Sequence, residues 1–254
     1  MHDGRAFGID IGGSGMKAAI VDTSTGDLLT ERLRIDTPQP ATPEAMADVV
    51  ARLVEGHQWT GPVGCAFPAV VRNGIVGSAA NIDDSWIDVD ADRLFTETLG
   101  EEVRMVNDAD AAGIAEMRFG VGRGRTGVVM VLTFGTGIGS GLFVDGTLVP
   151  NTELGHLELD GYDAEKRAAA SARKRDGLSW SEWGERVEHY LRHVERLFSP
   201  ELFIVGGGAS KKPEKWLPQI DIETEILVAE MENNAGIVGA ALVSPAVPVD
   251  TGAV

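Results

Sequence analysis

Hydrophobic and glycine residues form the same pattern in two parts of the chain. Residues 7–22 are an apolar run, a glycine-rich turn at positions 12–15 and a second apolar run. Residues 128–149 repeat this order around another glycine-rich turn and continue through Asp145-Gly146 into a third apolar run. Apolar runs bounded by glycine predict strand, turn and strand, and an Asp-Gly dipeptide favours a tight hairpin. Two copies of this strand–turn–strand motif indicate two similar halves, which we expect to face each other across a cleft.

Between and after these stretches the hydrophobic period changes to that of helices. Thr42-Pro43-Glu44 carries the signals of a helix start, and the apolar positions at helical spacing that follow end at Gly56. We also expect helices from residue 111, over 164–175, over 181–198 and over 234–242, and buried strands over 62–67, 103–106 and 202–205. In the helix over 181–198 the core-facing stripe is Trp183, Val187, Tyr190, Leu191, Val194 and Leu197.

Strands that alternate with helices, with an antiparallel meander at the start of each half, predict an α/β fold of mixed sheets. We place the change of domain after the strand over 103–106. Residues 1–108 are then an N-terminal α/β domain, which the C-terminal helix at about 234–244 joins, and residues 109–233 are a C-terminal α/β domain. The tail 245–254 is rich in proline and small residues, so we expect it to be disordered.

The two glycine turns are candidate phosphate-binding loops. Glycine lets a backbone turn approach a ligand, and successive free N–H groups form a nest for an anion. Asp10 is a candidate Mg²⁺ ligand at the mouth of the first turn, and Lys17 adds a point charge for the same phosphates. The alternative is an ordinary hairpin; a dinucleotide loop is excluded because each turn leads into a strand and not a helix. The loop residues are Asp10, Gly12, Gly13, Ser14, Gly15 and Lys17 in the first half, and Thr133, Gly135, Thr136, Gly137 and Gly139 in the second.

Composition narrows the class of ligand. The 254 residues carry 22 Lys and Arg against 39 Asp and Glu, a formal net charge of −17, whose field repels nucleic acids and anionic membranes. A polyanionic ligand therefore needs local basic patches, and three occur: Arg118, Arg123 and Arg125; Lys166, Arg167, Arg173, Lys174 and Arg175; Lys211, Lys212 and Lys215. No apolar run has the length of a membrane helix and the N-terminus lacks a signal-peptide core, so we expect a cytoplasmic protein.

Two polar stretches carry the candidate chemistry. Asp108 opens a helix after a strand, and a carboxylate there can accept the proton of a hydroxyl that attacks a phosphoryl group. The alternative is that Asp108 caps the helix. Asn107 has the donor and the acceptor that suit a sugar hydroxyl. Glu153 and His156 fit a metal pair, an acid/base pair or a clamp on hydroxyl groups, and we prefer the clamp.

Five motifs in one order resemble those of the ROK family of sugar kinases, within the actin/hexokinase-like (ribonuclease H-like) ATPase superfamily. They are DIGGSGMK, NDADAAGIAE, LTFGTGIGSGLFVDG, ELGH and IVGGG, and the resemblance covers about residues 7–243. It implies a two-domain fold with a cleft between the domains, and a homodimer. It also implies Asp108 as catalytic base, the glycine turns as phosphate loops, a nucleoside pocket at Gly206, Gly207 and Gly208, and sugar contacts from Asn81, Asn107, Glu153, His156 and Glu165.

The chain departs from the family pattern after ELGH. Typical members have a cysteine-rich zinc segment there, whereas residues 157–175 contain no cysteine, and we interpret the single Cys65 as a small core residue. We therefore expect no zinc site. In this respect, and in the segment GCAFPAVVRNGIVGSAANIDDSW, the chain is similar to zinc-free polyphosphate glucokinases. That similarity gives the basic residues between 166 and 175 a role near the phosphate chain.

The preferred hypothesis is a Mg²⁺-dependent transfer of a phosphoryl group from inorganic polyphosphate, and also from ATP, to the 6-hydroxyl of glucose. One alternative is an ATP-only hexokinase for mannose or an amino sugar. Another is a sugar-sensing protein of the same fold without catalysis, against which the presence of Asp10, Lys17 and Asp108 speaks.

Overall fold

The computed structural model describes residues 4–79 and 82–247 and divides into two compact units. Unit 1 comprises Met1–Ala115 and Asn233–Val254, and unit 2 comprises Glu116–Glu232. The division falls inside helix α3 (Asp108–Arg118), whereas we expected it at residue 108. Of the expected disordered tail, residues 248–254 lie outside the described residues, and residues 245–247 form a turn closed by a hydrogen bond from the Val247 N–H to the Ser244 carbonyl (2.9 Å).

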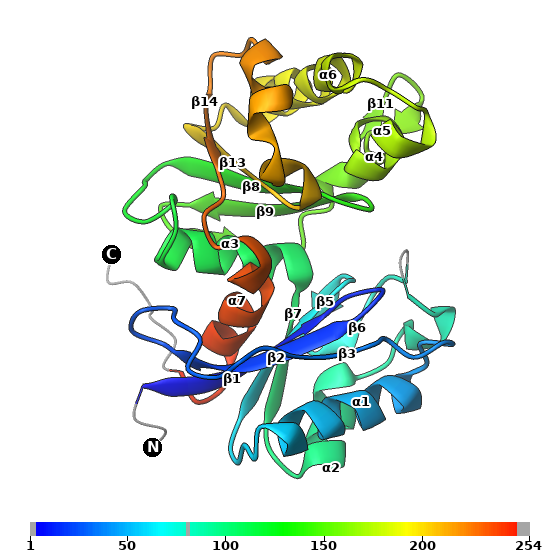
Figure 1. Cartoon of the computed structure of the whole chain (residues 1–254), viewed down its shortest axis with the longest axis vertical. Coiled ribbons are helices and arrows are strands. Elements are labelled where there is room, and N and C mark those ends of the chain that lie inside the picture. The colour runs from blue at the N-terminus through cyan, green and yellow to red at the C-terminus, as the bar shows by residue number, and fades with distance from the viewer. Residues whose placement is uncertain (1–3, 80–81, 248–254) are drawn as a thin grey trace. The chain divides into compact units, whose positions relative to one another are not determined.

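Each unit contains a five-stranded mixed sheet, and the two sheets have the same strand order (Figure 1). In unit 1 the order is β3-β2-β1-β4-β7, and the strands are β1 (Arg5–Ile11), β2 (Met16–Asp22), β3 (Leu33–Ile35), β4 (Val63–Phe67) and β7 (Val103–Asn107). In unit 2 the order is β10-β9-β8-β13-β14, and the strands are β8 (Val128–Phe134), β9 (Ile138–Val144), β10 (Thr147–Val149), β13 (Leu202–Gly206) and β14 (Glu225–Val228). In both sheets an antiparallel meander of three strands is extended by two parallel strands. The predicted α/β class with mixed sheets is confirmed.

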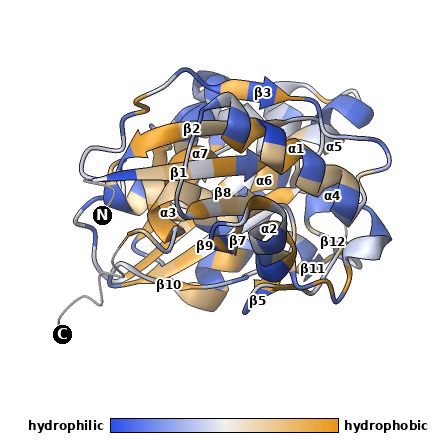
Figure 2. Ribbon diagram, turned by 90° about the horizontal axis from the view of Figure 1, so that it is seen from below, coloured by the Kyte–Doolittle hydropathy of each residue, from blue (hydrophilic) through white to orange (hydrophobic). Residues whose placement is uncertain are grey.

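Helices pack on both faces of the sheet of unit 1. Helices α1 (Pro43–Gly56) and α2 (Ala91–Leu99) cover one face, and α7 (Ala235–Val243) covers the other (Figure 1). Large apolar residues at alternate positions of β1 and β4 point to α1 and α2, because the side chains of a strand alternate between its faces. The mostly hydrophobic colour of β2 in Figure 2 reflects the same core. Cys65 is fully buried in β4, as expected of a core residue, and burial raises the pKa of its thiol.

Helix α7 approaches the sheet closely because small residues line the contact. A Cβ added to Gly8 in β1 would collide with the carbonyl oxygen of Ile237, and one added to Gly64 in β4 would collide with that of Ala240. The absence of side chains at these positions lets the helix backbone lie directly on the strands. The first turn of α7 is thereby held next to the end of β1, where Asp10 lies.

In unit 2, helix α6 (Trp180–Phe198) covers the sheet with the predicted apolar stripe (Figure 1). It begins with a capping box, in which the Ser179 hydroxyl and the Glu182 carboxylate each accept the other's backbone N–H. Five residues of the stripe are buried against strands β8 and β13. Leu197 was predicted to belong to the core, which is wrong, because it is 55% exposed and Phe198 packs against the core at this end of the helix.

The prediction of one continuous helix over 164–175 is wrong. This stretch forms two short helices, α4 (Glu165–Ala168) and α5 (Ala170–Arg175). Ala169 between them is extended, with ψ 154°. The indole N–H of Trp183 donates to the carbonyls of Ala168 (3.0 Å) and Ala169 (3.1 Å). The Trp183 indole thus binds the Ala168 carbonyl where the two helices meet, while the Ala169 carbonyl also accepts the N–H groups of Ala172 (3.1 Å) and Arg173 (3.4 Å).

The remaining elements are short. They are the hairpin β5 (Val71–Arg72) and β6 (Ile75–Val76), the hairpin β11 (Glu158–Leu159) and β12 (Tyr162–Asp163), and 3₁₀ helices η1 (Asp84–Trp86), η2 (Leu154–His156), η3 (Gly208–Lys211), η4 (Pro213–Lys215), η5 (Leu217–Gln219) and η6 (Glu232–Asn234). Within the described part of the chain, no helix is long and apolar enough to cross a membrane.

Candidate active site

The first glycine turn, between β1 and β2, is held by side chains that bind its carbonyl groups. The Gly12 N–H donates to the Gly15 carbonyl (3.2 Å), while the Thr37 hydroxyl donates to the Gly12 carbonyl (2.5 Å) and Arg34 donates to that of Ser14 (2.9 Å). Gly13 and Ser14 are exposed, and their N–H groups make no hydrogen bond with other described residues. A turn with fixed carbonyls and open N–H groups is suited to bind an anion.

Asp10 and Lys17 face each other beside this turn. They are cross-strand partners in β1 and β2, and the Lys17 ammonium lies 3.2 Å from the Asp10 carboxylate. Both side chains are largely buried, with 19% of Asp10 and 30% of Lys17 exposed. A Cβ added to Gly236, in the first turn of α7, would lie 2.8 Å from the carboxyl carbon of Asp10. The carboxylate therefore lies at a helix N-terminus, where the helix dipole stabilises negative charge.

Asp108 is the first residue of α3 and directly follows β7. The Asn107 side-chain oxygen accepts the N–H groups of Ala109 (2.9 Å) and Asp110 (3.1 Å), and its amide donates to the Ala69 carbonyl (3.1 Å). Asn107 is 6% exposed. The cap of α3 is therefore Asn107, which settles the alternative that Asp108 has this task. The cap fixes the position at which α3 begins and therefore the backbone of Asp108. Asp108 itself is half-buried.

The second glycine turn, between β8 and β9, is built like the first. The Gly135 N–H donates to the Gly137 carbonyl (3.0 Å). Ser171 of α5 holds the turn from outside, because its N–H donates to the Gly135 carbonyl (3.0 Å) and its hydroxyl to the Thr136 carbonyl (2.5 Å). The N–H groups of Thr136 and Gly137 make no hydrogen bond with other described residues. Both units thus carry a turn with its carbonyls bound and its N–H groups open.

Glu165 lies against the second turn. Its carboxylate accepts the Ile138 N–H (3.2 Å), and a Cβ added to Gly137 would collide with the same carboxylate oxygen. Gly155 lies on the other side, where an added Cβ would be 3.3 Å from that oxygen. Glu165 therefore fills a notch between two glycines and joins the phosphate loop to the ELGH segment.

Glu153 and His156 belong to a chain of charged side chains in unit 2. The His156 Nε2 lies 4.0 Å from the Glu153 carboxylate, and its Nδ1 lies 3.5 Å from Asp163, which in turn pairs with Lys166 at 3.3 Å. Burial raises the pKa of Glu153, His156 opposes this rise, and the charge of Glu165 adds to it. Lys166, and after it His156, lower the pKa of Asp163. The ring of His156 is therefore oriented with Nδ1 towards Asp163 and Nε2 towards Glu153.

The three glycines at 206–208 are the last residue of β13 and the two residues after it, and they lie beside the second turn. Gly206 pairs with Thr133 in the parallel ladder between β13 and β8. Gly207 has φ +79°, and an added Cβ would lie 2.7 Å from the carbonyl oxygen of Phe134. Only glycine fits this position, so the chain leaves β13 in direct contact with the strand that leads into the phosphate loop.

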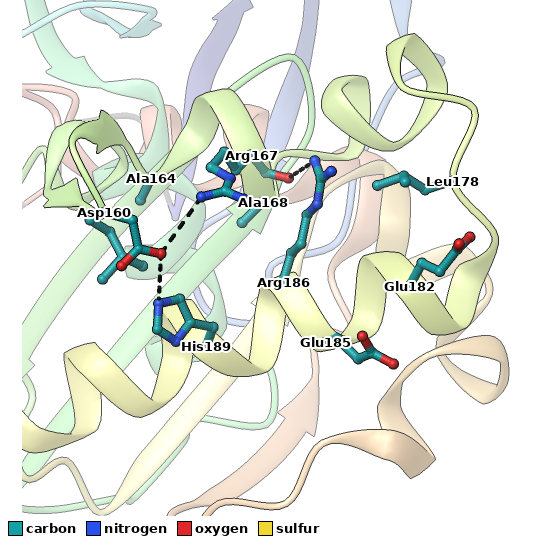
Figure 3. A pocket seen from close by; sticks show the side chains of 10 residues that line it. Asp160, Ala164, Arg167, Ala168, Leu178, Glu182, Glu185, Arg186 and His189 are labelled. Carbon is teal, nitrogen blue, oxygen red and sulfur yellow. Dashed lines mark hydrogen bonds and ion pairs between the residues drawn. The ribbon is translucent and has the colours of Figure 1, made fainter.

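A separate pocket of about 360 Å³ lies between α4 and α6, and none of the predicted site residues lines it (Figure 3). Its charged side chains bind one another. Asp160 lies 3.1 Å from His189 and 3.6 Å from Arg167, while Arg186 reaches out to Asp176 at 2.7 Å. The side chain of His189 is 56% exposed.

Within each unit, the predicted site residues lie close to one another. In unit 1 Asp10 and Lys17 meet beside the first turn; in unit 2 Glu153, His156 and Glu165 share one cluster. Asn81 lies outside the described residues. In the described ranges 4–79 and 82–247, no group of three or more His, Cys, Asp or Glu side chains is arranged to hold a metal ion.

Several supporting residues are not evident from the sequence. Thr37, Arg34 and Ser171 hold the turns but are distant from them along the chain. Asp163 had a local signal, since Lys166 follows it at the i,i+3 spacing of a helical ion pair. Long-range contacts with backbone carbonyls leave no such signal.

Two sheets of identical strand order, each opening with a glycine-turn meander, define the class of the protein: an actin/hexokinase-like (ribonuclease H-like) ATPase fold. The model of the ROK family matches residues 6–174. The chain belongs to the ROK family.

Relatives within the family are similar over almost the whole chain. A polyphosphate glucokinase of Mycobacterium tuberculosis is 49% identical over 243 residues, which are 95% of this chain and 92% of the relative. The crystal structure of inorganic polyphosphate/ATP-glucomannokinase from Arthrobacter sp. strain KM is 54% identical with a TM-score of 0.90, covering 94% of this chain and 97% of the other. A ROK family glucokinase from Streptomyces griseus, in complex with glucose and AMPPNP, is 27% identical with a TM-score of 0.76, covering 94% and 98%.

Proposed function

We propose that this protein transfers the terminal phosphoryl group of inorganic polyphosphate, and also of ATP, to the 6-hydroxyl of glucose. The observation that carries the proposal is the pair of equivalent glycine turns with open N–H groups, together with Asp108 held at the start of α3. The similarity to polyphosphate glucokinase and to polyphosphate/ATP-glucomannokinase supports the choice of donor and acceptor. Phosphoryl transfer needs positioning and neutralisation of charge more than covalent chemistry, which suits such a set of groups.

In the proposed reaction the Asp108 carboxylate accepts the proton of the glucose 6-hydroxyl. The hydroxyl oxygen forms a bond to the terminal phosphorus, and the bond from that phosphorus to the bridging oxygen breaks. The products are glucose 6-phosphate and either ADP or a polyphosphate shortened by one phosphate. A base positioned in this way contributes about 10²–10⁴-fold to the rate.

The sugar contacts are assigned as the family resemblance implies. We assign hydroxyl contacts to Glu153, His156 and Glu165 in unit 2 and to Asn107 and Asn81 in unit 1. The contacts of its ring with Glu153 and Asp163 support the role of His156, because they fix which ring nitrogen faces Glu153. Asn107 and Glu165 combine this role with a structural one, since both also bind backbone N–H groups.

The phosphate contacts are assigned to the two glycine turns. In the first, Asp10 offers a carboxylate oxygen beside open N–H groups, and Mg²⁺ typically binds one or two carboxylates together with substrate phosphates. Mg²⁺, when bound there, neutralises phosphate charge. Lys17 pairs with Asp10 and adds a second positive charge at the same place. We assign the glycines at 206–208 to the nucleoside part of ATP.

We further propose that the protein is a cytoplasmic homodimer, as the family resemblance implies. Light scattering of the purified protein measures its mass in solution, and a monomeric mass contradicts the dimer.

The test of the function is a coupled assay of glucose 6-phosphate with Mg²⁺, run separately with polyphosphate and with ATP. A panel of glucose, mannose and amino sugars at a fixed donor defines the acceptor. We expect activity on glucose with both donors. Activity with ATP alone contradicts the polyphosphate assignment, and glucose binding without turnover contradicts the enzyme.

A further inference from the structure

The three basic clusters of the sequence differ in how far their charges are already neutralised. In the cluster between 166 and 175 four side chains have partners: Lys166 with Asp163 (3.3 Å), Arg167 with Asp160 (3.6 Å), Arg175 with Asp176 (2.7 Å), and Arg173 over the ring of Trp180 (4.0 Å). In the first cluster Arg125 pairs with Glu225 at 2.9 Å. A polyanion bound there would have to displace these partners.

The third cluster, which we call the lysine segment, consists of Lys211 at the end of η3, Lys212 between η3 and η4, and Lys215 at the end of η4. All three side chains are exposed, and their ammonium groups form no ion pair or hydrogen bond with other described residues. Residues 208–215 contain these three lysines and one acid, Glu214, and so carry a net charge of +2 in a protein of −17. This segment can take up an anion without losing an existing contact.

The backbone of the lysine segment is anchored by a buried tryptophan. Trp216 follows Lys215 directly, is fully buried, and donates its indole N–H to the Ala209 carbonyl (3.1 Å). Its ring packs against Trp183 (5.0 Å between centroids) and Phe134 (6.0 Å). The lysines therefore project from a fixed loop rather than from a free one.

The lysine segment also begins beside the second phosphate loop. It follows Gly207, whose close contact with Phe134 holds it against β8, and the phosphate loop begins at the next residue, Gly135. Both features belong to unit 2. The backbone that carries the lysines therefore starts from a point in contact with the strand that leads to the open N–H groups of Thr136 and Gly137.

We propose that Lys211, Lys212 and Lys215 bind the part of a long polyphosphate donor that extends beyond the phosphate loop. This inference rests on the proposed function. The ammonium groups act as point charges on successive phosphates, so the contribution depends on chain length and falls with salt. ATP continues into a nucleoside, which we assign to the glycines at 206–208, and tripolyphosphate has only three phosphates, so neither donor places further phosphates on these lysines.

The test is the triple variant Lys211→Gln, Lys212→Gln, Lys215→Gln. The matched control replaces Arg5, Arg72 and Arg104 by glutamine; these arginines of unit 1 are exposed and form no ion pair with other described residues. Both variants have a net charge of −17 − 3 = −20. Because the variant loses three exposed ion pairs with phosphates, its KM for long-chain polyphosphate rises about tenfold. Its kcat, its KM for tripolyphosphate and its KM for ATP stay at the wild-type values, and the control changes none of them.

A lysine variant with an unchanged KM for long-chain polyphosphate overturns the inference, and so does an equal rise in KM for ATP. Replacement of the same lysines by arginine must restore the wild-type KM. Calorimetric titration with long-chain polyphosphate separates the inference from the proposed function, because it needs no turnover. If the wild type transfers no phosphate to glucose, the proposed function fails. Weaker binding to the lysine variant than to the control still supports the inference, and equal binding refutes it.

Discussion

Replacement of Gly207 by alanine tests how the end of β13 is held against the second phosphate loop. Gly207 has φ +79° and ψ −165°, a region that is essentially restricted to glycine. An added Cβ would lie 2.7 Å from the carbonyl oxygen and 2.8 Å from the nitrogen of Phe134. The backbone strain costs about 1–3 kcal/mol and the crowding about 1–3 kcal/mol more, so we expect a loss of about 2–6 kcal/mol in the free energy of unfolding.

The assay is urea unfolding followed by tryptophan fluorescence, since Trp183 and Trp216 pack against Phe134 and report on this region. The matched control is Gly124→Ala. Gly124 has φ +73°, but an added Cβ there meets no atom within 4 Å, so only the backbone strain of about 1–2 kcal/mol applies. Gly207→Ala also lowers kcat, because a displaced Phe134 moves the loop that begins at Gly135.

An equal loss of stability in the two glycine variants would refute the reasoning. It would mean that the close contact with Phe134 adds nothing to the strain of a positive φ. Wild-type kcat in Gly207→Ala would refute the second step, the coupling of this contact to the phosphate loop.

Three further predictions concern single side chains. Asp108→Ala lowers kcat at least about 100-fold while the melting temperature stays near the wild type; more than about 1% of the wild-type kcat excludes Asp108 as the base. Asn107→Ala removes the cap of α3, costs about 0.5–2 kcal/mol in urea unfolding and lowers kcat by displacing Asp108; full stability contradicts the cap. Glu116 is 1% exposed, and burial raises its pKa although it accepts the N–H of Met231 (2.7 Å). Its folded pKa lies above the unfolded value, so its stabilising contribution is complete below the usual pKa of 4.5 and is lost as pH rises through the raised value. Glu116→Gln therefore flattens the decline of the unfolding free energy over that window, and an unchanged pH profile contradicts this role.

Much of the fold was predictable because its signals are local. The glycine turns lie between apolar runs, and the start of α1 is marked by Thr42, whose hydroxyl accepts the Ala45 N–H (3.4 Å). The same strand order in both units follows from two copies of one meander. Alternation, caps and turn residues act over a few positions and can be recognised without coordinates.

What could not be predicted depends on contacts between distant residues. Nothing in the alanine-rich sequence around Ala169 indicates a break, and the indole of Trp183, which binds the Ala169 carbonyl, lies fourteen positions on. The sequence left open whether Asp108 caps α3, since Asn and Asp are nearly equal as caps and only the geometry assigns the cap to Asn107. The sequence also did not show which of the basic side chains form ion pairs with acidic residues. That difference is what distinguishes the lysine segment from the other two clusters.

The most direct measurement of the central claim is a ³¹P NMR spectrum of the protein with glucose, long-chain polyphosphate and Mg²⁺. The account predicts that the phosphomonoester signal of glucose 6-phosphate grows as the polyphosphate shortens, without matching release of orthophosphate. Orthophosphate as the main product would show that water and not glucose is the acceptor. An unchanged spectrum would contradict phosphoryl transfer from polyphosphate altogether.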